Sequence, residues 1–267
     1  MDTRTLIRWQ DLTTEAVGGH ARRDAVVILP MAAIEQHGPH LPLDTDLRIG
    51  MGLLDAVAPL LPSDLEPLVL PPMAIATSTE HTHFAGTLSL TPETALAVLR
   101  EIGAAVAHAG FRRVVLANSH GGNTAIMELA ALDLRRAHGL LVTKHHYFLQ
   151  PLPKTIDIPE RECRHGLHGG LIETAMMRVL APKLVQMDRA PDAHSLGEDL
   201  EGTTRRLGPT GETAFAWMAD DLNPGGVVGA ADRATPELGQ ALIDHYAEGL
   251  ARAITDTAAF PIERLAR

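Results

Sequence analysis

Short apolar runs alternate with segments of helical periodicity along this chain, and this alternation restricts the fold more than any other feature. The runs of β-branched and aliphatic residues lie at 25–29, 68–70, 113–117 and 140–149. Apolar residues recur every three or four positions at about 46–61, 91–110, 124–138, 170–180 and 235–254. Continuous apolar strands separated by helices indicate an α/β domain with a mostly parallel sheet, buried on both faces.

Several helix boundaries carry local signals. Thr-Pro-Glu occurs at 91–93 and again at 235–237, and each triplet offers a hydroxyl cap, a proline at the first helical position and an acid facing the helix dipole. Gly110 and Gly139 are placed to end two of the helices. No repeat or linker interrupts the chain, so we expect a single domain over residues 1–267, with the Gly- and Pro-rich segment 201–234 as a lid or subunit contact.

Composition and charge exclude several classes of protein. The chain has 45% apolar residues, and its 23 Lys and Arg against 33 Asp and Glu give a formal net charge of −10. Nucleic acid and anionic membrane surfaces are therefore unfavourable partners, and no apolar stretch reaches the length of a membrane span. The N-terminus has no signal-peptide pattern and Cys163 is the single cysteine, so we expect a cytoplasmic protein.

The residues suited to chemistry follow the predicted strands. Glu35, His37 and Asp46 come directly after the run at 25–29, and His120 follows the run at 113–117. Ligands of open α/β sheets collect at the carboxyl ends of strands, so these side chains should converge there. Near the start of the helix at 170–180, the side chain of Glu173 is positioned to reach the same crevice.

Histidine and carboxylate ligands without thiolate suit zinc, manganese or iron, and five or more ligands suggest two divalent ions, most often Zn²⁺. Asp46 is the candidate bridge between the two ions. Such a pair lowers the pKa of a shared water toward about 7 and polarises a carbonyl, and that combination is the chemistry of amide hydrolysis.

Simpler interpretations exist for each residue alone. The alternative role of Glu35 is an ion pair with an arginine, and that of Asp46 is a helix cap. We interpret Glu80-His81-Thr82-His83 as pocket wall. The chain has no G-x-S-x-G elbow, H-E-x-x-H, P-loop or G-x-G-x-x-G motif, which disfavours serine hydrolases, zincins, nucleoside triphosphatases and dinucleotide enzymes. Cys163 lacks an obvious base and is a weak candidate nucleophile.

Four segments of the chain resemble the creatininase (creatinine amidohydrolase) family: 35–46, 80–90, 118–123 and 168–174. The resemblance implies a three-layer α/β/α sandwich, a homohexamer, and a dinuclear centre acting on a C–N bond. It assigns one ion to Glu35, Asp46 and His120 and the other to His37, Asp46 and Glu173. His168 would be the proton shuttle, so the catalytic candidates are His168 and Glu173.

Departures from creatininase proper disfavour creatinine as the substrate. In creatininase proper a glutamate ligand closely follows the histidine, whereas Gly121 and Gly122 follow His120 here, so Glu173 must substitute. Creatininase proper also has a glutamate before its catalytic histidine and tryptophans in its pocket, whereas here Leu167 precedes His168 and both tryptophans lie outside the motifs. The His-Gly-Gly-Asn form is similar to that of the deformylase and mycofactocin-peptidase branches.

We therefore expect a hydrolase of a small amide, cyclic amide or formamide. Two alternatives stay open: a metal-dependent lyase or isomerase of a keto or sugar-like substrate, and an inactive metal-binding scaffold, which Leu167 favours because it removes a charge beside the shuttle.

Overall fold

The computed structural model describes residues 5–152 and 155–266 and contains a five-stranded parallel sheet of order β1-β3-β2-β4-β5. The α/β class predicted from the alternation of apolar runs is confirmed. The strands are β1 (Ile7–Arg8), β2 (Val26–Met31), β3 (Leu68–Val69), β4 (Arg113–Asn118) and β5 (Leu141–His146).

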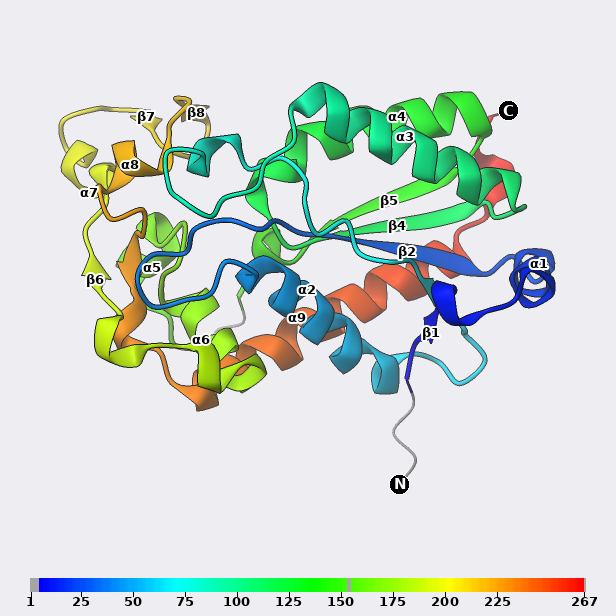
Figure 1. Cartoon of the computed structure of the whole chain (residues 1–267), viewed down its shortest axis with the longest axis horizontal. Helices are drawn as coiled ribbons and strands as arrows, with labels where there is room; N and C mark the ends of the chain where they lie inside the picture. Colours follow the sequence, from blue (N-terminus) through cyan, green and yellow to red (C-terminus); the bar gives the residue numbers. More distant parts are fainter. Residues whose placement is uncertain (1–4, 153–154, 267) are drawn as a thin grey trace.

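Helices cover both faces of this sheet. One layer contains α3 (Pro92–His108) and α4 (Thr124–His138), and the other contains α2 (Thr45–Val57) and α9 (Pro236–Ala259). Figure 1 shows the first pair above the strands and the second pair below them. The result is the expected three-layer sandwich.

The side chains of β2 explain why both faces must be covered. All six residues of the strand are buried, and neighbouring side chains point to opposite faces. Val27 and Leu29 pack in the core beneath α3 and α4, whereas Val26 and Ile28 pack in the core beneath α2 and α9. Exposing either set would leave a continuous apolar surface in water, so the strand is stable only between two helical layers.

A third core joins α6 (Leu171–Leu180) to α2 and α9. Ile49 and Leu53 of α2, Met176 of α6 and Tyr246 of α9 are all buried in it. This packing fixes the start of α6 relative to the carboxyl ends of the strands.

Most helix boundaries agree with the sequence signals. Thr91 and Thr235 cap α3 and α9 by accepting hydrogen bonds from the third following backbone N–H, and Gly139 ends α4 with a φ of 69°. The helix predicted at 46–61 ends at Val57, because Pro59 has no N–H to continue it and a 3-10 turn follows.

The strand predicted at 140–149 was too long. Pairing between β4 and β5 stops at Asn118 and His146, where β4 ends, and residues 147–149 form a 3-10 turn instead. The helix α1 (Thr14–Arg22) had not been predicted. Gly18 and Gly19 interrupt its pattern, and glycine lowers helix propensity.

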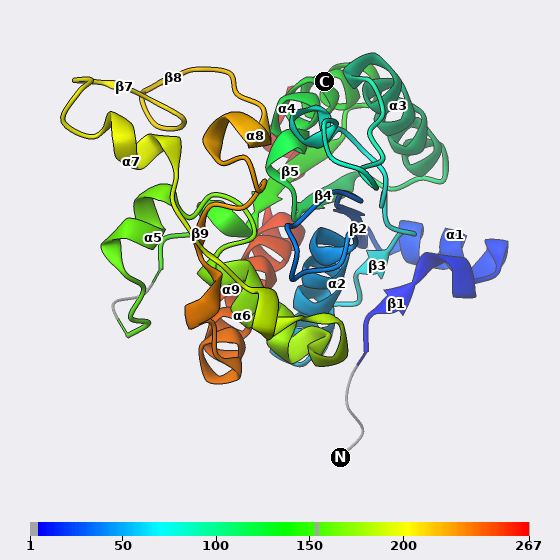
Figure 2. The same cartoon turned by 60° about the vertical axis from the view of Figure 1, so that its left-hand side comes forward.

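The segment from 156 to 234 contains short elements outside the sheet. They gather around the end of the sheet opposite α1, where the loops after β2 and β4 also lie (Figures 1 and 2). No helix within the described ranges is long and apolar enough to cross a membrane. The short elements are α5 (Glu160–His165), β6 (Asp192–Ala193), α7 (Leu196–Leu200), β7 (Leu207–Gly208), β8 (Thr213–Ala214), α8 (Ala219–Leu222) and β9 (Gly229–Ala230).

Candidate metal centre

The side chains singled out in the sequence converge at the carboxyl ends of β2 and β4. Three segments of the chain supply them: the loop after β2 with the first turn of α2, the turn after β4, and the loop and first turn of α6. Histidine and carboxylate ligand atoms form three overlapping groups there, each with its atoms within 4.8 Å of one another. The groups are Glu35, His37 and His168; Glu35, Asp46 and His120; and His37, Asp46 and Glu173.

Asp46 lies at the centre of this cluster. Its Oδ1 is 3.3 Å from His37 Nε2, and its Oδ2 is 3.1 Å from His120 Nδ1. The two oxygens of one carboxylate thus face two different ligand sets, as a bridging carboxylate requires. These sets contain the same residues as the two sets implied by the family resemblance.

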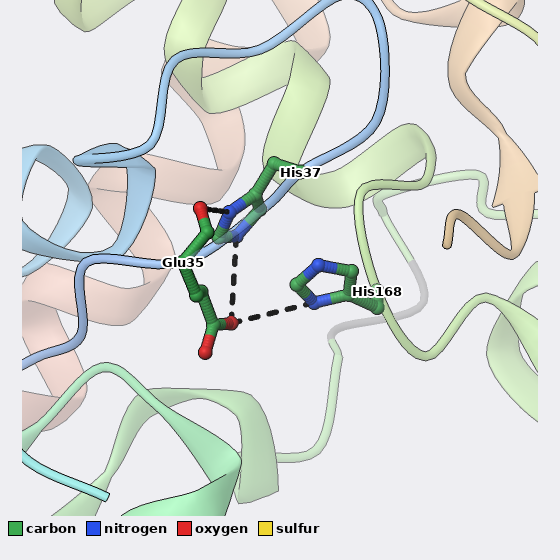
Figure 3. Close-up of side chains that lie close together, drawn as sticks. All are labelled: Glu35, His37 and His168. Carbon is green, nitrogen blue, oxygen red and sulfur yellow. Dashed lines mark hydrogen bonds and ion pairs between the residues drawn. The ribbon is translucent and has the colours of Figure 1, made fainter. Parts of the chain in front are cut away.

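His168 lies beside Glu35 and His37. Figure 3 shows its ring facing Glu35, with 3.7 Å between His168 Nδ1 and Glu35 Oε1. The other ring nitrogen, Nε2, lies 2.7 Å from the carbonyl oxygen of Gln36. A carbonyl oxygen only accepts hydrogen bonds, so Nε2 donates its hydrogen, and in the neutral ring the lone pair of Nδ1 faces the cluster.

Unpaired polar atoms support a cation at this place. Glu35 Oε1, His37 Nε2 and Asp46 Oδ2 are buried, and among the described residues no group forms a hydrogen bond of suitable geometry with them. A buried polar atom without a partner costs about 1–3 kcal/mol, and more when it is charged. Divalent ions would satisfy all three atoms, so this donor set fits a metal.

The electrostatics of the cluster agree with that fit. Burial lowers the pKa of His37, but the negative charges of Asp46, Glu173 and Glu35 outweigh it and raise the pKa to about 9. Burial raises the pKa of Glu173 to about 7, although His37 opposes it. Without metal, the cluster therefore retains protons to offset its negative charge, a task that divalent cations would take over.

The pKa of His168 is shifted in the opposite direction to that of His37. Burial lowers it well below its usual value, and the neighbouring rings of His37 and His81 lower it further. The ring of His168 lies between theirs, with centroids 4.2 Å and 4.1 Å away. This environment favours a neutral imidazole.

The two histidines predicted to line the pocket lie in different places. His81 is buried, with Nε2 3.5 Å from Glu35 Oε1, and its Nδ1 lies 2.8 Å from the side-chain nitrogen of Gln36. His83 instead pairs with Asp220 of α8 at 2.9 Å and contacts none of the cluster. His81 thus forms part of the site wall, whereas His83 joins that wall to the segment at 201–234.

Two contacts to the cluster had no signal in the sequence. The Ser78 hydroxyl donates a hydrogen bond to Glu35 Oε2. Tyr147 is buried beside Glu173, and burial together with the charges of Glu173 and Asp46 raises the pKa of its phenol. A lone serine in an irregular segment and a tyrosine beyond a strand end are too common to single out.

The segment expected to be a lid or subunit contact touches the cluster through residues 226–230. The Val228 N–H donates to the carbonyl of His168 at 2.9 Å, and the side chain of Gln36 donates to the carbonyl of Gly226 at 2.8 Å. These bonds fasten the segment to Gln36, which lies between Glu35 and His37, and to His168.

Glu162 of α5 ties this segment to α6. Its carboxylate accepts hydrogen bonds from the backbone N–H of Leu171 at 2.7 Å and of Ala230 at 2.8 Å. Three glycines surround this carboxylate: Gly166, Gly170 and Gly229. A Cβ atom at any of them would lie 2.3 to 2.8 Å from a carboxylate oxygen of Glu162, so only glycine leaves enough room for this side chain.

Comparison with known proteins gives a consistent family assignment. The model of the family described as "Creatininase: Creatinine amidohydrolase" matches residues 10–254. The mycofactocin precursor peptide peptidase of Mycobacterium ulcerans (strain Agy99) is 34% identical over 73% of this chain and 82% of its own length. The creatinine amidohydrolase of Pseudomonas putida is 29% identical over 70% of this chain and 74% of its own length.

Solved structures share the fold. A crystal structure of creatinine amidohydrolase superposes with a TM-score of 0.75 at 26% identity, covering 96% of this chain and 98% of that one. A structure described as "Creatininase Mn" superposes with a TM-score of 0.74 at 26% identity, covering 96% and 100% of the two chains. With the family model, the relatives and the fold in agreement, the chain belongs to the creatininase family of amidohydrolases.

Proposed function

We propose that this protein hydrolyses the C–N bond of a small amide, cyclic amide or formamide with the help of two divalent ions. The observation that carries the proposal is the position of Asp46, whose two carboxylate oxygens lie 3.3 Å and 3.1 Å from histidines of two different ligand sets. One ion would be held by Glu35, Asp46 and His120, and the other by His37, Asp46 and Glu173.

Imidazole and carboxylate ligands without thiolate suit zinc, manganese and iron, and we take zinc as the first candidate. Manganese and Zn-Zn forms of creatininase are among the structural neighbours. When bound, the two ions would lower the pKa of a water between them toward about 7 and polarise the substrate carbonyl.

His168 is positioned to move the proton of the reaction. Its Nε2–H is held by the carbonyl of Gln36, which fixes the ring and leaves Nδ1 facing the cluster. Nδ1 accepts a proton from the attacking water and passes it to the leaving nitrogen, which departs as a neutral amine. Burial of the ring excludes bulk water from competing for that proton.

Glu173 has a second role besides holding an ion. Its side chain is 17% exposed, against 1% for Glu35 and 2% for Asp46. It is therefore the proposed carboxylate ligand that an entering substrate meets first, so we place it among the catalytic residues.

The tryptophans argue against creatinine as the substrate. Trp9 packs against Phe111, with ring centroids 5.3 Å apart, and Trp217 donates its indole N–H to the carbonyl of Pro209. Neither ring lies at the cluster. The amide bond of a peptide is a second candidate, because the relative that is 34% identical is named a peptide peptidase.

Assembly and location also belong to the proposal. Leu129 and Leu132 on α4 are 56% and 68% exposed, and apolar surface of this kind favours a homo-oligomer, a hexamer by family resemblance. Light scattering on the purified protein tests the hexamer, and cell fractionation tests the cytoplasmic location.

The activity is tested by metal loading followed by turnover of an amide panel. The panel contains creatinine, N-formyl compounds and short peptide amides, and we expect chelator-sensitive, water-consuming hydrolysis that returns on addition of Zn²⁺ or Mn²⁺. His168→Ala should keep both ions and lose at least about 100-fold in kcat, the contribution typical of a general acid–base group. His108→Ala is the matched control and should keep full activity, since His108 is exposed at the C-terminal end of α3, near the start of β4 and not near its carboxyl end.

Three results would contradict the proposal. Absence of divalent metal after loading would refute the dinuclear centre. Solvent deuterium appearing in the product without consumption of water would identify a lyase or isomerase. A metal-loaded protein that turns over no amide of the panel would contradict the proposal, whereas turnover of any amide above background would exclude the scaffold.

A further inference from the structure

A carboxylate outside the three ligand groups lies beside His120. Glu80 belongs to the 3-10 turn Thr79–His81, and its Oε1 is 3.5 Å from His120 Nε2. Its side chain is 20% exposed, so it lies at the border between the cluster and solvent. The other ring nitrogen of His120, Nδ1, faces Asp46 and Glu35 at 3.1 Å and 3.3 Å.

The glycine at position 122 leaves room for this carboxylate. A Cβ atom on Gly122 would lie 2.4 Å from Glu80 Oε1 and 2.5 Å from His120 Nε2. Real Cβ atoms do not approach other atoms so closely. Glu80 can therefore occupy its observed position only because residue 122 is a glycine. Glu80 occupies this space from a distant part of the chain.

Hydrogen bonds hold the segment that carries Glu80 in this place. The Thr77 hydroxyl donates to the carbonyl of Gly122 at 2.9 Å, and the Thr77 N–H donates to the side chain of Asn123 at 3.2 Å. The N–H of Ser78 donates to the Ser89 hydroxyl at 2.9 Å. These bonds define how far Glu80 stands from the turn that carries His120.

His120 needs an acceptor at this point. Its Nε2 is buried, and among the described residues no group forms a hydrogen bond with it. A histidine that binds a metal through one nitrogen ordinarily donates the other N–H to a carboxylate, carbonyl or water, which fixes the tautomer and the ring orientation. The Glu80 carboxylate lies within reach of a small rotation of either side chain.

We infer that Glu80 is a positioning residue for the metal centre: it accepts the Nε2–H of His120 and so leaves the lone pair of Nδ1 directed at the ion shared with Glu35 and Asp46. This inference rests on the proposed dinuclear centre and adds a residue that lies outside its ligand sets. Loss of such a partner typically weakens metal binding about 10- to 100-fold.

Three substitutions of Glu80 distinguish the effect of its side-chain length from the effect of its negative charge. Glu80→Gln loses the charge but keeps an acceptor oxygen at the same reach, and should retain the Zn²⁺ affinity of the wild type. Glu80→Asp keeps the charge, but its side chain is one methylene shorter, so the carboxylate lies farther from His120. This variant and Glu80→Ala should each bind one Zn²⁺ about 10- to 100-fold more weakly than the wild type. Zn²⁺ dissociation constants are measured by competition with a chromophoric chelator, and bound zinc is counted by elemental analysis.

Thr79→Ala is the control, since Thr79 is exposed in the same 3-10 turn, and it should bind Zn²⁺ as the wild type does. Wild-type affinity in Glu80→Asp or in Glu80→Ala would overturn the inference, and so would weakening in Glu80→Gln equal to that in Glu80→Asp. A raised KM with unchanged metal affinity would also overturn it and would assign Glu80 to substrate binding. If the Ala variant does not fold, the Gln and Asp variants decide between these outcomes.

The wild type distinguishes the two levels of the proposal. A wild type that binds no zinc refutes the dinuclear centre itself. A wild type that binds two ions while Glu80→Asp and Glu80→Ala bind equally well refutes only the role of Glu80.

Discussion

Replacing Asp46 by alanine should remove both metal ions together. Asp46 is the member shared by the ligand sets of Glu35 with His120 and of His37 with Glu173. The substitution leaves each ion with two protein ligands in place of three. Glu173→Gln, in contrast, weakens the ligand set of only one ion.

The size of the effect follows from linkage. A ligand present at 100 times its dissociation constant stabilises the folded state by about 2.7 kcal/mol, so two ions contribute about 5 kcal/mol. For a domain of this size about 1 kcal/mol moves the melting temperature by about 2–4 °C, so metal should raise it by about 10–20 °C in the wild type. The rise should be about half as large in Glu173→Gln and near zero in Asp46→Ala.

Differential scanning calorimetry with and without chelator measures these shifts, and elemental analysis counts the ions. Asp44→Ala is the matched control, because Asp44 lies two residues away and pairs with Arg48 at 2.8 Å outside the cluster. It should lose no ion and keep the full shift. Two ions and a full shift in Asp46→Ala would refute the bridge, and loss of both ions in Glu173→Gln would refute the division into two ligand sets.

Two further predictions concern stability. Gly239→Ala places a Cβ 1.9 Å from the backbone oxygen of Ala175, which cannot move without α6, so it should destabilise by about 1–3 kcal/mol. Gly249→Ala in the same helix meets only the end of a flexible side chain and should stay within about 1 kcal/mol of the wild type; equal losses in urea unfolding would contradict this reasoning. Burial raises the pKa of Glu198, but its ion pair with Arg161 outweighs burial and lowers that pKa below the usual 4.5. The pair therefore stabilises the fold above pH 4.5, and the advantage over Glu198→Gln, about 1 kcal/mol at pH 7, should disappear as the pH falls through the lowered pKa of Glu198. An advantage that grows in acid would show that the sign is wrong.

The parts of the fold that the sequence predicted depend on local rules. A hydroxyl residue before proline is a local signal for the start of a helix, and both Thr91 and Thr235 cap helices here. Glu35 and His120 each follow a strand of a parallel sheet, and the carboxyl ends of parallel strands lie at the same edge of the sheet. The convergence of the proposed ligands was accessible from the sequence for this reason.

The parts that it did not predict depend on long-range contacts. The segment from 72 to 90 has no periodicity, and its course is set by bonds such as that from the Leu88 N–H to the carbonyl of Ile34 at 2.8 Å. The approach of Glu80 to His120 and of Ser78 to Glu35 follows from that course. Neither contact is visible before the chain is folded.

The carboxylate of Glu162 has a consequence for changing the substrate range of this enzyme. Residues 226–230 border the cluster and would be the natural target for redesign, yet Ala230 and Leu171 share this one buried group. A loop redesigned without regard to Glu162 would shift the first turn of α6, and with it Glu173. If Glu173 holds an ion as proposed, changing this loop would also change metal binding, so a redesign should graft residues 162–173 and 226–230 as a unit.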